Sequence, residues 1–164
     1  MILQYFKKKE NEYKIISDKI YLSSLELTKK IMSKNYFKLN NFDSSFEILS
    51  IILIFNLKYS KDRSDKKYIL INENIIKNLI NDLDKSLRDL GISDMQIGKY
   101  VKKFVKKFYF RLKKIDLILN NFSQKKFEDY IITIKNIETD TVTELALDLI
   151  RIKEIIKKNT ENSL

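Results

Sequence analysis

Cysteine, histidine, proline and tryptophan are all absent from this chain of 164 residues, and glycine occurs only twice. Without cysteine and histidine the chain has no thiolate nucleophile, none of the usual zinc ligand sets and no imidazole general base. Any catalysis would have to use Asp, Glu, Lys, Ser or Tyr. The lack of cysteine also excludes a disulfide framework, which is consistent with a reducing compartment. We therefore expect no metal ion, no cofactor and no catalytic residue.

A long apolar run is also missing. The most apolar segment, FEILSIILIFNL at 46–57, has twelve residues, whereas a membrane-spanning helix needs about 20. The N-terminal segment MILQYFKKKENEY places its lysines after a short apolar stretch, the reverse of the order in a signal peptide. We therefore expect no secretion, and we expect residues 46–57 to form a buried central helix.

The composition is that of a folded, basic protein. Hydrophobic residues make up 44% of the chain, and the net charge is +10. A chain of this length can bury about two thirds of the surface that it exposes when unfolded, and it suits one domain. The positive charge favours an anionic partner such as RNA, a ribosome or an acidic membrane face.

Apolar residues recur three and four positions apart through most of the chain, which predicts an all-α fold. We expect one compact domain over 1–164, a bundle of about six helices. Asp43 and Asn72 are candidate N-terminal caps. The segment IITIKNIETDTV at 131–142 has the β-branched character of a strand but no evident pairing partner, so we expect a helix followed by a turn. The expected helices are 10–33, 43–58, 72–90, 95–120, 123–136 and 140–158.

The segment DLDKSLRDLGISD at 82–94 raises three possibilities, namely a metal loop, a catalytic carboxylate pair or the end of a helix. A calcium loop starting at Asp82 would need Gly and Glu where Leu87 and Ser93 stand. Asp82 and Asp84 point in different directions on a helix, which argues against a shared metal or an acid and base pair. A helix end explains more of the segment.

The helix expected before this segment has one apolar face, which we expect to be buried. Gly91 suits the C-terminus of that helix, and Ser93 with Gln96 resembles a capping box for the next one. Asp84 and Arg88 have the spacing of an ion pair within a helix. The segment is therefore predicted to be a corner between two helices. The apolar face comprises Ile76, Leu79, Ile80, Leu83, Leu87 and Leu90.

The helix expected at 95–120 has an apolar face and a basic face. Between residues 95 and 114 there are eight basic residues and no acidic one. The basic face is either a solvated surface or a contact for an anionic surface. Its lysines are Lys99, Lys102, Lys103, Lys106 and Lys113, and the first four are the candidates for that contact. Arg111 lies at the edge of the apolar face, where an unpaired cation would be costly. The acidic residues near the turn are its candidate partners.

The stretch DLDKSLRDLGISDMQIGKYVKKFVKKFYFRL resembles the signature of the ubiquinol-cytochrome c chaperone family, the assembly factors for cytochrome b of respiratory complex III. The earlier stretch FDSSFEILSIILIFNL resembles the segment that leads into an apolar helix of that family. The resemblance covers roughly 36–119. The signature positions are Asp82, Asp84, Lys85, Leu87, Arg88, Asp89, Gly91, Asp94, Lys99, Phe108, Tyr109 and Arg111.

This chain departs from the family pattern at four positions. A helical His of the family is replaced here by an apolar residue, Ile52, and the Arg before Phe-Glu is Ser45. Gly98 stands at a usual Pro, and Phe110 at a usual Gly. The first stretch has therefore lost two polar residues of the pattern, whereas the second keeps nearly all of it.

The resemblance implies a helical chaperone without enzymatic activity that binds newly made cytochrome b or another complex III precursor. A ribosome or a small partner protein is an expected further partner, because mitochondrial relatives use both. The chain is more similar to the short bacterial form of the family, which implies a cytoplasmic protein in peripheral contact with the anionic inner face of the cytoplasmic membrane. We expect no DNA binding. The residues expected to bind the client or to define the motif are Asp82, Asp84, Arg88, Gly91, Asp94, Lys99, Tyr109 and Arg111.

Two questions stay open at the level of sequence. The Asp and Arg residues of the motif could either form a buried network that fixes two helices or contact a client. The protein could alternatively be a basic helical protein that binds RNA or a ribosome. An enzyme is less favoured, because helical enzymes with paired Asp motifs place two such motifs around magnesium, and only one acidic block occurs here.

Overall fold

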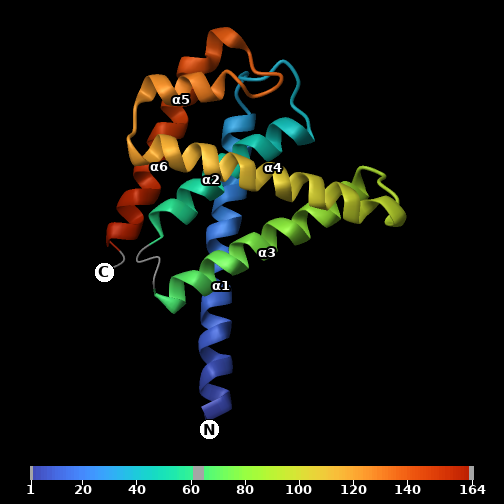
Figure 1. Cartoon of the computed structure of the whole chain (residues 1–164), viewed down its shortest axis with the longest axis vertical. Coiled ribbons are helices and arrows are strands. Elements are labelled where there is room, and N and C mark those ends of the chain that lie inside the picture. Colours follow the sequence, from blue (N-terminus) through green and yellow to red (C-terminus); the bar gives the residue numbers. More distant parts are fainter. Residues whose placement is uncertain (1, 61–64, 163–164) are drawn as a thin grey trace. The chain divides into compact units, whose positions relative to one another are not determined.

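A computed structural model describes residues 2–60 and 65–162, with side chains described for 10–60 and 65–160 (Figure 1). Over these residues the chain forms six α-helices, one short 3-10 helix and no strand, so the all-α prediction is confirmed. None of the described helices is long and apolar enough to cross a membrane. The helices are α1 (Ile2–Met32), α2 (Phe42–Tyr59), α3 (Lys66–Asp89), α4 (Asp94–Asn120), α5 (Gln124–Ile131) and α6 (Val142–Asn162), and the 3-10 helix is η1 (Thr139–Thr141).

The N-terminal ends of α2 and α3 differ from those predicted. Asn41 caps α2, because its Oδ1 accepts a hydrogen bond of 3.0 Å from the backbone N–H of Ser44, and Asp43 lies in the first turn. Asp65 caps α3, because its side chain accepts a hydrogen bond of 2.9 Å from the backbone N–H of Lys67. Asn72, the predicted cap, is inside the helix. Several side chains near the start of each helix could serve as its N-terminal cap. Which of them does so depends on the residue at which the helix begins in the folded chain.

The segment after α5 differs from the predicted helix to 136. The helix ends at Ile131, and Ile137 forms an isolated antiparallel bridge with Phe37. Backbone hydrogen bonds join Lys38 N–H to Asn136 O at 2.8 Å and Glu138 N–H to Tyr36 O at 2.9 Å. The strand-like segment therefore finds a partner about 100 residues earlier, which satisfies its backbone groups.

The chain comprises two compact units, whose boundaries fall within α1, at the end of α2 and within α4. The first contains residues 1–23 and 60–109, and the second contains 24–59 and 110–164. In the first unit α3 runs into a tight turn and α4 returns from it, forming a helical hairpin (Figure 1). The apolar face of α3 is buried at every fourth residue, namely Ile71, Ile75, Leu79, Leu83 and Leu87. That residues 1–164 form a single domain stays a prediction.

The second unit is built around α2. This helix packs against α6, and α6 also packs against α5. Every residue of α2 from Phe46 to Phe55 is buried, as expected for a helix surrounded by others. The rings of Phe55 and Phe127 lie 6.1 Å apart in this core. The predicted buried helix at 46–57 is therefore confirmed over most of its length.

Candidate functional site

The corner between α3 and α4 has the backbone geometry predicted from Gly91. Gly91 adopts a φ of 87°, in the left-handed region. Ile92 N–H donates to Leu87 O at 3.1 Å, and Gly91 N–H donates to Arg88 O at 2.8 Å. These two bonds form a Schellman motif, which satisfies carbonyl groups at the end of α3. The corner is thus fixed by backbone hydrogen bonds around one glycine.

Adding a methyl group at Gly91 is expected to destabilise the protein, since a non-glycine residue is disfavoured in this conformation. We expect Gly91→Ala to lower the free energy of unfolding by about 1 kcal/mol, measured by urea denaturation. Gly98→Ala is the matched control, because Gly98 lies in helical α4 with open space around it. That change is expected to raise the free energy of unfolding by about 0.5 to 1 kcal/mol. Two changes of the same sign would contradict the prediction.

Charged side chains bridge the corner on its solvent side. Arg88 Nε donates a hydrogen bond of 2.7 Å to Asp84 Oδ2, as the i,i+4 spacing predicts. The same guanidinium pairs with Asp94. The hydrogen bonds from Arg88 to Asp84 and Asp94 raise the pKa of the guanidinium. Arg88 and Asp84 are 44% and 43% exposed, so the pair contributes little to stability. These charges are displayed to solvent and are not a buried network.

Asp82 has a different environment from the rest of the acidic segment. Its Oδ2 accepts a hydrogen bond of 2.9 Å from the hydroxyl of Tyr21 on α1. Burial, together with the neighbouring charge of Asp82, raises the pKa of Tyr21 well above its usual value. Asp82 therefore joins α3 to α1, whereas Asp84 faces the corner. The two carboxylates make separate contacts, as their spacing on a helix predicts.

The basic face of α4 begins beside the corner. Lys99, Lys102, Lys103 and Lys106 are all exposed. Together with Gly98 and Tyr100 they line an open hollow of about 840 Å³. Tyr109 is half-exposed and meets Phe108 edge-on, with ring centroids 5.8 Å apart. The first unit thus presents lysines and one aromatic ring on the same part of α4.

Arg111 belongs to the second unit and is paired there with Glu47 of α2. Its Nε and Nη2 donate to the two carboxylate oxygens of Glu47 at 3.0 and 2.9 Å. The side chains are 14% and 3% exposed, so this bidentate pair is buried. Burial alone would lower the pKa of Arg111, but the hydrogen bonds to Glu47 outweigh it and the pKa is raised. The expectation that the acids near the turn pair with Arg111 was wrong.

Two residues of this buried cluster were not identified from the sequence. Glu47 is the only carboxylate in the buried stretch of α2 from Phe46 to Phe55, and that isolation could have indicated a cationic partner. Tyr130 of α5 places its ring 5.8 Å from the Arg111 guanidinium. Burial raises the pKa of Tyr130, a shift that the Arg111 charge reduces and the Glu47 charge increases. Nothing in the local pattern indicates that Tyr130 lies here.

The structure therefore separates the predicted residues into three groups. Asp84, Arg88, Gly91 and Asp94 form the exposed corner. The lysines and Tyr109 lie along α4 in the same unit. Asp82 and Arg111 make structural contacts with Tyr21 and Glu47 respectively. Only the first two groups are available to a partner at the surface.

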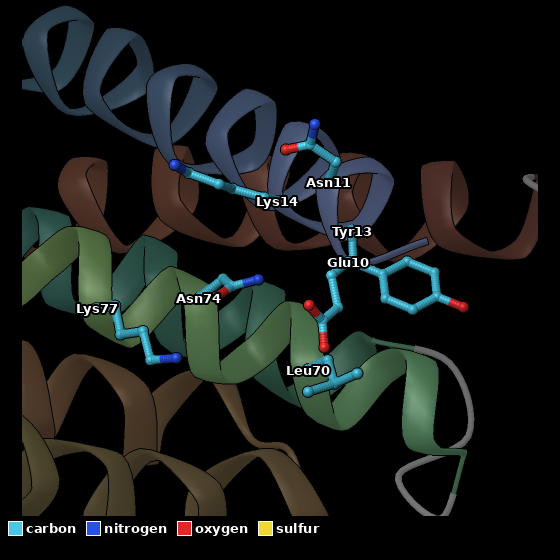
Figure 2. Close-up of a pocket in the computed structure, with 7 residues that line it drawn as sticks. All are labelled: Glu10, Asn11, Tyr13, Lys14, Leu70, Asn74 and Lys77. Carbon is cyan, nitrogen blue, oxygen red and sulfur yellow. The ribbon is translucent and has the colours of Figure 1, made fainter. Parts of the chain in front are cut away.

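A further hollow lies between α1 and α3 in the first unit (Figure 2). It has a volume of about 550 Å³. In Figure 2 the side chains of Glu10 and Lys14 come from α1, while Lys77 comes from α3. Because the lining carries charges of both signs, it does not create a strong electrostatic field of one sign. None of the site residues predicted from the sequence lines this hollow. Its other lining residues are Asn11, Tyr13, Leu70 and Asn74.

Comparison with known proteins relates this fold to one family. None of the curated proteins compared with the chain matches it. The crystal structure of the Cbp3 homolog from Brucella abortus is similar, with a TM-score of 0.76 and 22% identity over 96% of this chain and 88% of that chain. This likeness shows a shared fold. The family model described as Ubiquinol-cytochrome C chaperone matches residues 36–137, which include the corner, the basic face and the buried Arg111 cluster. The chain therefore belongs to the ubiquinol-cytochrome c chaperone family.

Proposed function

We propose that this protein is an assembly chaperone for cytochrome b of the ubiquinol-cytochrome c reductase, respiratory complex III. It binds the newly made client by protein contacts, without catalysis, in the cytoplasm at the inner face of the cytoplasmic membrane. The observation that carries the proposal is the family match over residues 36–137. That range contains every residue suggested above for client or partner contact.

The exposed corner is the part of the surface that we assign to client recognition. Arg88, Asp84 and Asp94 form a charged cluster whose contribution to folding is small, and Lys99 and Tyr109 lie further along α4. Charged and aromatic groups that are free of a structural task can make specific contacts with a partner. The buried pair of Arg111 and Glu47 supports the second unit from within.

Deleting the gene is expected to lower assembled complex III while the other respiratory complexes persist. The measurement is the absorbance of reduced b-type haem in membranes, together with native gel electrophoresis of the complexes. A chaperone that protects one client should affect only the complex containing it. Unchanged cytochrome b and complex III in the deletion strain would contradict the proposal.

Affinity purification from membranes then tests whether the corner contacts the client. The tagged wild-type protein should enrich cytochrome b, and Arg88→Gln should reduce that enrichment without unfolding the protein. Arg151→Gln is the matched control, because Arg151 is also an exposed arginine paired with an aspartate, Asp148. If both variants enrich cytochrome b as well as the wild type does, Arg88 is not part of the contact.

RNA or ribosome binding is a second candidate function, favoured by the exposed row Lys99, Lys102, Lys103 and Lys106 in a stretch of α4, from Met95 to Ile115, that has no acidic residue. It requires an RNA affinity that falls with increasing salt and with neutralisation of these lysines. A ribosome, or a small partner protein, could also serve the chaperone as a further partner. RNA copurification without cytochrome b would favour this second function over the first.

A further inference from the structure

Two exposed apolar side chains flank the turn between α3 and α4, one just before it in the sequence and one just after it. Leu90 follows the last residue of α3 and is 60% exposed, and Met95 in the first turn of α4 is 98% exposed. The sequence places Leu90 on the buried face of α3, but the helix ends at Asp89 and the Schellman turn leaves Leu90 in solvent. The tip of the hairpin therefore presents apolar surface that the fold itself does not use.

The outward face of α4 continues from this tip with a regular pattern. Met95, Lys99, Lys102, Lys106 and Tyr109 follow one another at intervals of four and three residues, so they lie on one side of the helix. All five are exposed, and all belong to the first unit. Lys103 lies beside this row. We call Leu90 and these six residues the tip and lysine stripe.

The charge around the stripe is predominantly positive. From Met95 onward, α4 contains no acidic residue before Asp116. Arg88 pairs with both Asp84 and Asp94, so these three side chains together keep one negative charge. Asp89, an exposed carboxylate at the end of α3, adds a second, but the four lysines of the stripe outnumber these two negative charges.

We propose that the tip and lysine stripe binds the surface of an anionic lipid bilayer, with Leu90 and Met95 entering the boundary between headgroups and acyl chains. The lysines contact lipid phosphates, and Tyr109 lies at the level of the headgroups. RNA phosphates would satisfy the lysines equally well but offer no apolar environment to the tip. The combination of both features in one stripe therefore favours a lipid surface over a nucleic acid.

This inference deepens the proposed function, since a chaperone for a membrane-embedded cytochrome has to meet its client at the lipid surface. It names the part of the chain that makes the contact. The contact is tested on the whole purified protein with lipid vesicles and without the client. A failure of vesicle binding therefore overturns this inference alone, whereas unchanged complex III in the deletion strain overturns only the proposed function.

A single tryptophan can report the insertion, because the chain has none of its own. In Met95→Trp, emission is expected to move to shorter wavelength on vesicles of phosphatidylcholine mixed with phosphatidylglycerol, and lipids brominated in the acyl chain should quench it. Leu22→Trp is the control, because Leu22 is an exposed leucine on α1 of the same unit, 59% exposed. Its emission should not change. An unchanged emission at position 95 overturns the inference.

Sedimentation with the same vesicles measures the contribution of each part of the stripe. Changing Lys99, Lys102, Lys103 and Lys106 to Gln is expected to weaken binding by at least about 100-fold, since each lysine near an anionic surface contributes about fivefold. Changing Lys29, Lys30, Lys125 and Lys126 to Gln alters the net charge equally at exposed positions elsewhere and should have a much smaller effect. Equal weakening by the two sets would overturn the inference.

The tip is tested by the double variant Leu90→Ser with Met95→Ser. Binding should weaken about tenfold, and the loss should persist at high salt because burial of apolar surface is not screened. Circular dichroism checks that this double variant and the variant with the four stripe lysines changed to Gln keep the helical fold. Salt-dependent binding of RNA together with no binding to the anionic vesicles would assign the stripe to nucleic acid and overturn the inference.

Discussion

Replacing Arg111 by methionine is expected to lower the free energy of unfolding by about 3 to 5 kcal/mol, because it removes the bidentate guanidinium from the buried Glu47 carboxylate. Glu47 is only 3% exposed, and both of its oxygens accept hydrogen bonds from the Arg111 guanidinium. Water cannot replace those bonds easily at such a position. Urea denaturation monitored by circular dichroism measures the change.

The control for this prediction is Arg151→Met, which removes an arginine that is 75% exposed and paired with Asp148. We expect a change within about 0.5 kcal/mol there, since exposed pairs contribute little. The double variant Glu47→Leu with Arg111→Met removes both charges and should recover much of the lost stability. A loss below about 1 kcal/mol for Arg111→Met would show that the pair is not a structural support.

Arg111→Lys separates a structural role from client contact. Lysine keeps the charge but cannot make the bidentate contact of a guanidinium, so partial loss of stability is expected together with complex III levels that follow the folded fraction. A variant that is as stable as the wild type but fails to support complex III would instead indicate that Arg111 contacts the client. The two roles therefore predict opposite combinations of stability and activity.

Replacing Asp148 by alanine is the second change with a large expected effect, about 2 kcal/mol of destabilisation. Asp148 accepts a hydrogen bond of 2.6 Å from the hydroxyl of Tyr36, a buried residue, and one of 3.2 Å from Arg151, and it also pairs with Lys34. Its loss leaves the Tyr36 hydroxyl without its acceptor. The segment that pairs with Ile137 should loosen, which hydrogen exchange at Lys38 can detect.

The same carboxylate makes stability depend on pH. Burial alone would raise the pKa of Asp148, but the hydrogen bonds from Lys34 and Tyr36 outweigh it and hold the pKa below its usual value. A carboxylate whose pKa is lower in the folded state stabilises the fold above its unfolded pKa, and this contribution is lost as the pH falls. Urea denaturation of the wild type should therefore show stability falling between about pH 5 and pH 2, and Asp148→Ala should fall less steeply.

Glu154→Gln is the comparison for this pH dependence. A hydrogen bond from Lys153 also lowers the pKa of Glu154, but that carboxylate is 48% exposed, so solvent screening reduces its contribution. We expect the slope of the wild type to change more in Asp148→Ala than in Glu154→Gln. Identical slopes for the wild type and Asp148→Ala would contradict the role assigned to Asp148.

The features that could be predicted from the sequence are local ones. The spacing of apolar residues predicts the helices, because side chains three and four apart share a face. The ion pair between Asp84 and Arg88 and the turn at Gly91 depend on positions only a few residues apart. The exposed lysines of α4 follow from the same periodicity. The family resemblance also rests on these local motifs, and the match over 36–137 confirms it.

The tertiary structure alone decided which distant side chains meet. Arg111 and Glu47 are 64 residues apart, and Tyr21 and Asp82 are 61 residues apart. The bridge between Phe37 and Ile137 and the exposure of Leu90 likewise depend on where helices end and what packs beside them. Periodicity shows which face of a helix is apolar but not which residue lies opposite it. A buried charge or an unpaired backbone group finds its partner only when the chain is folded.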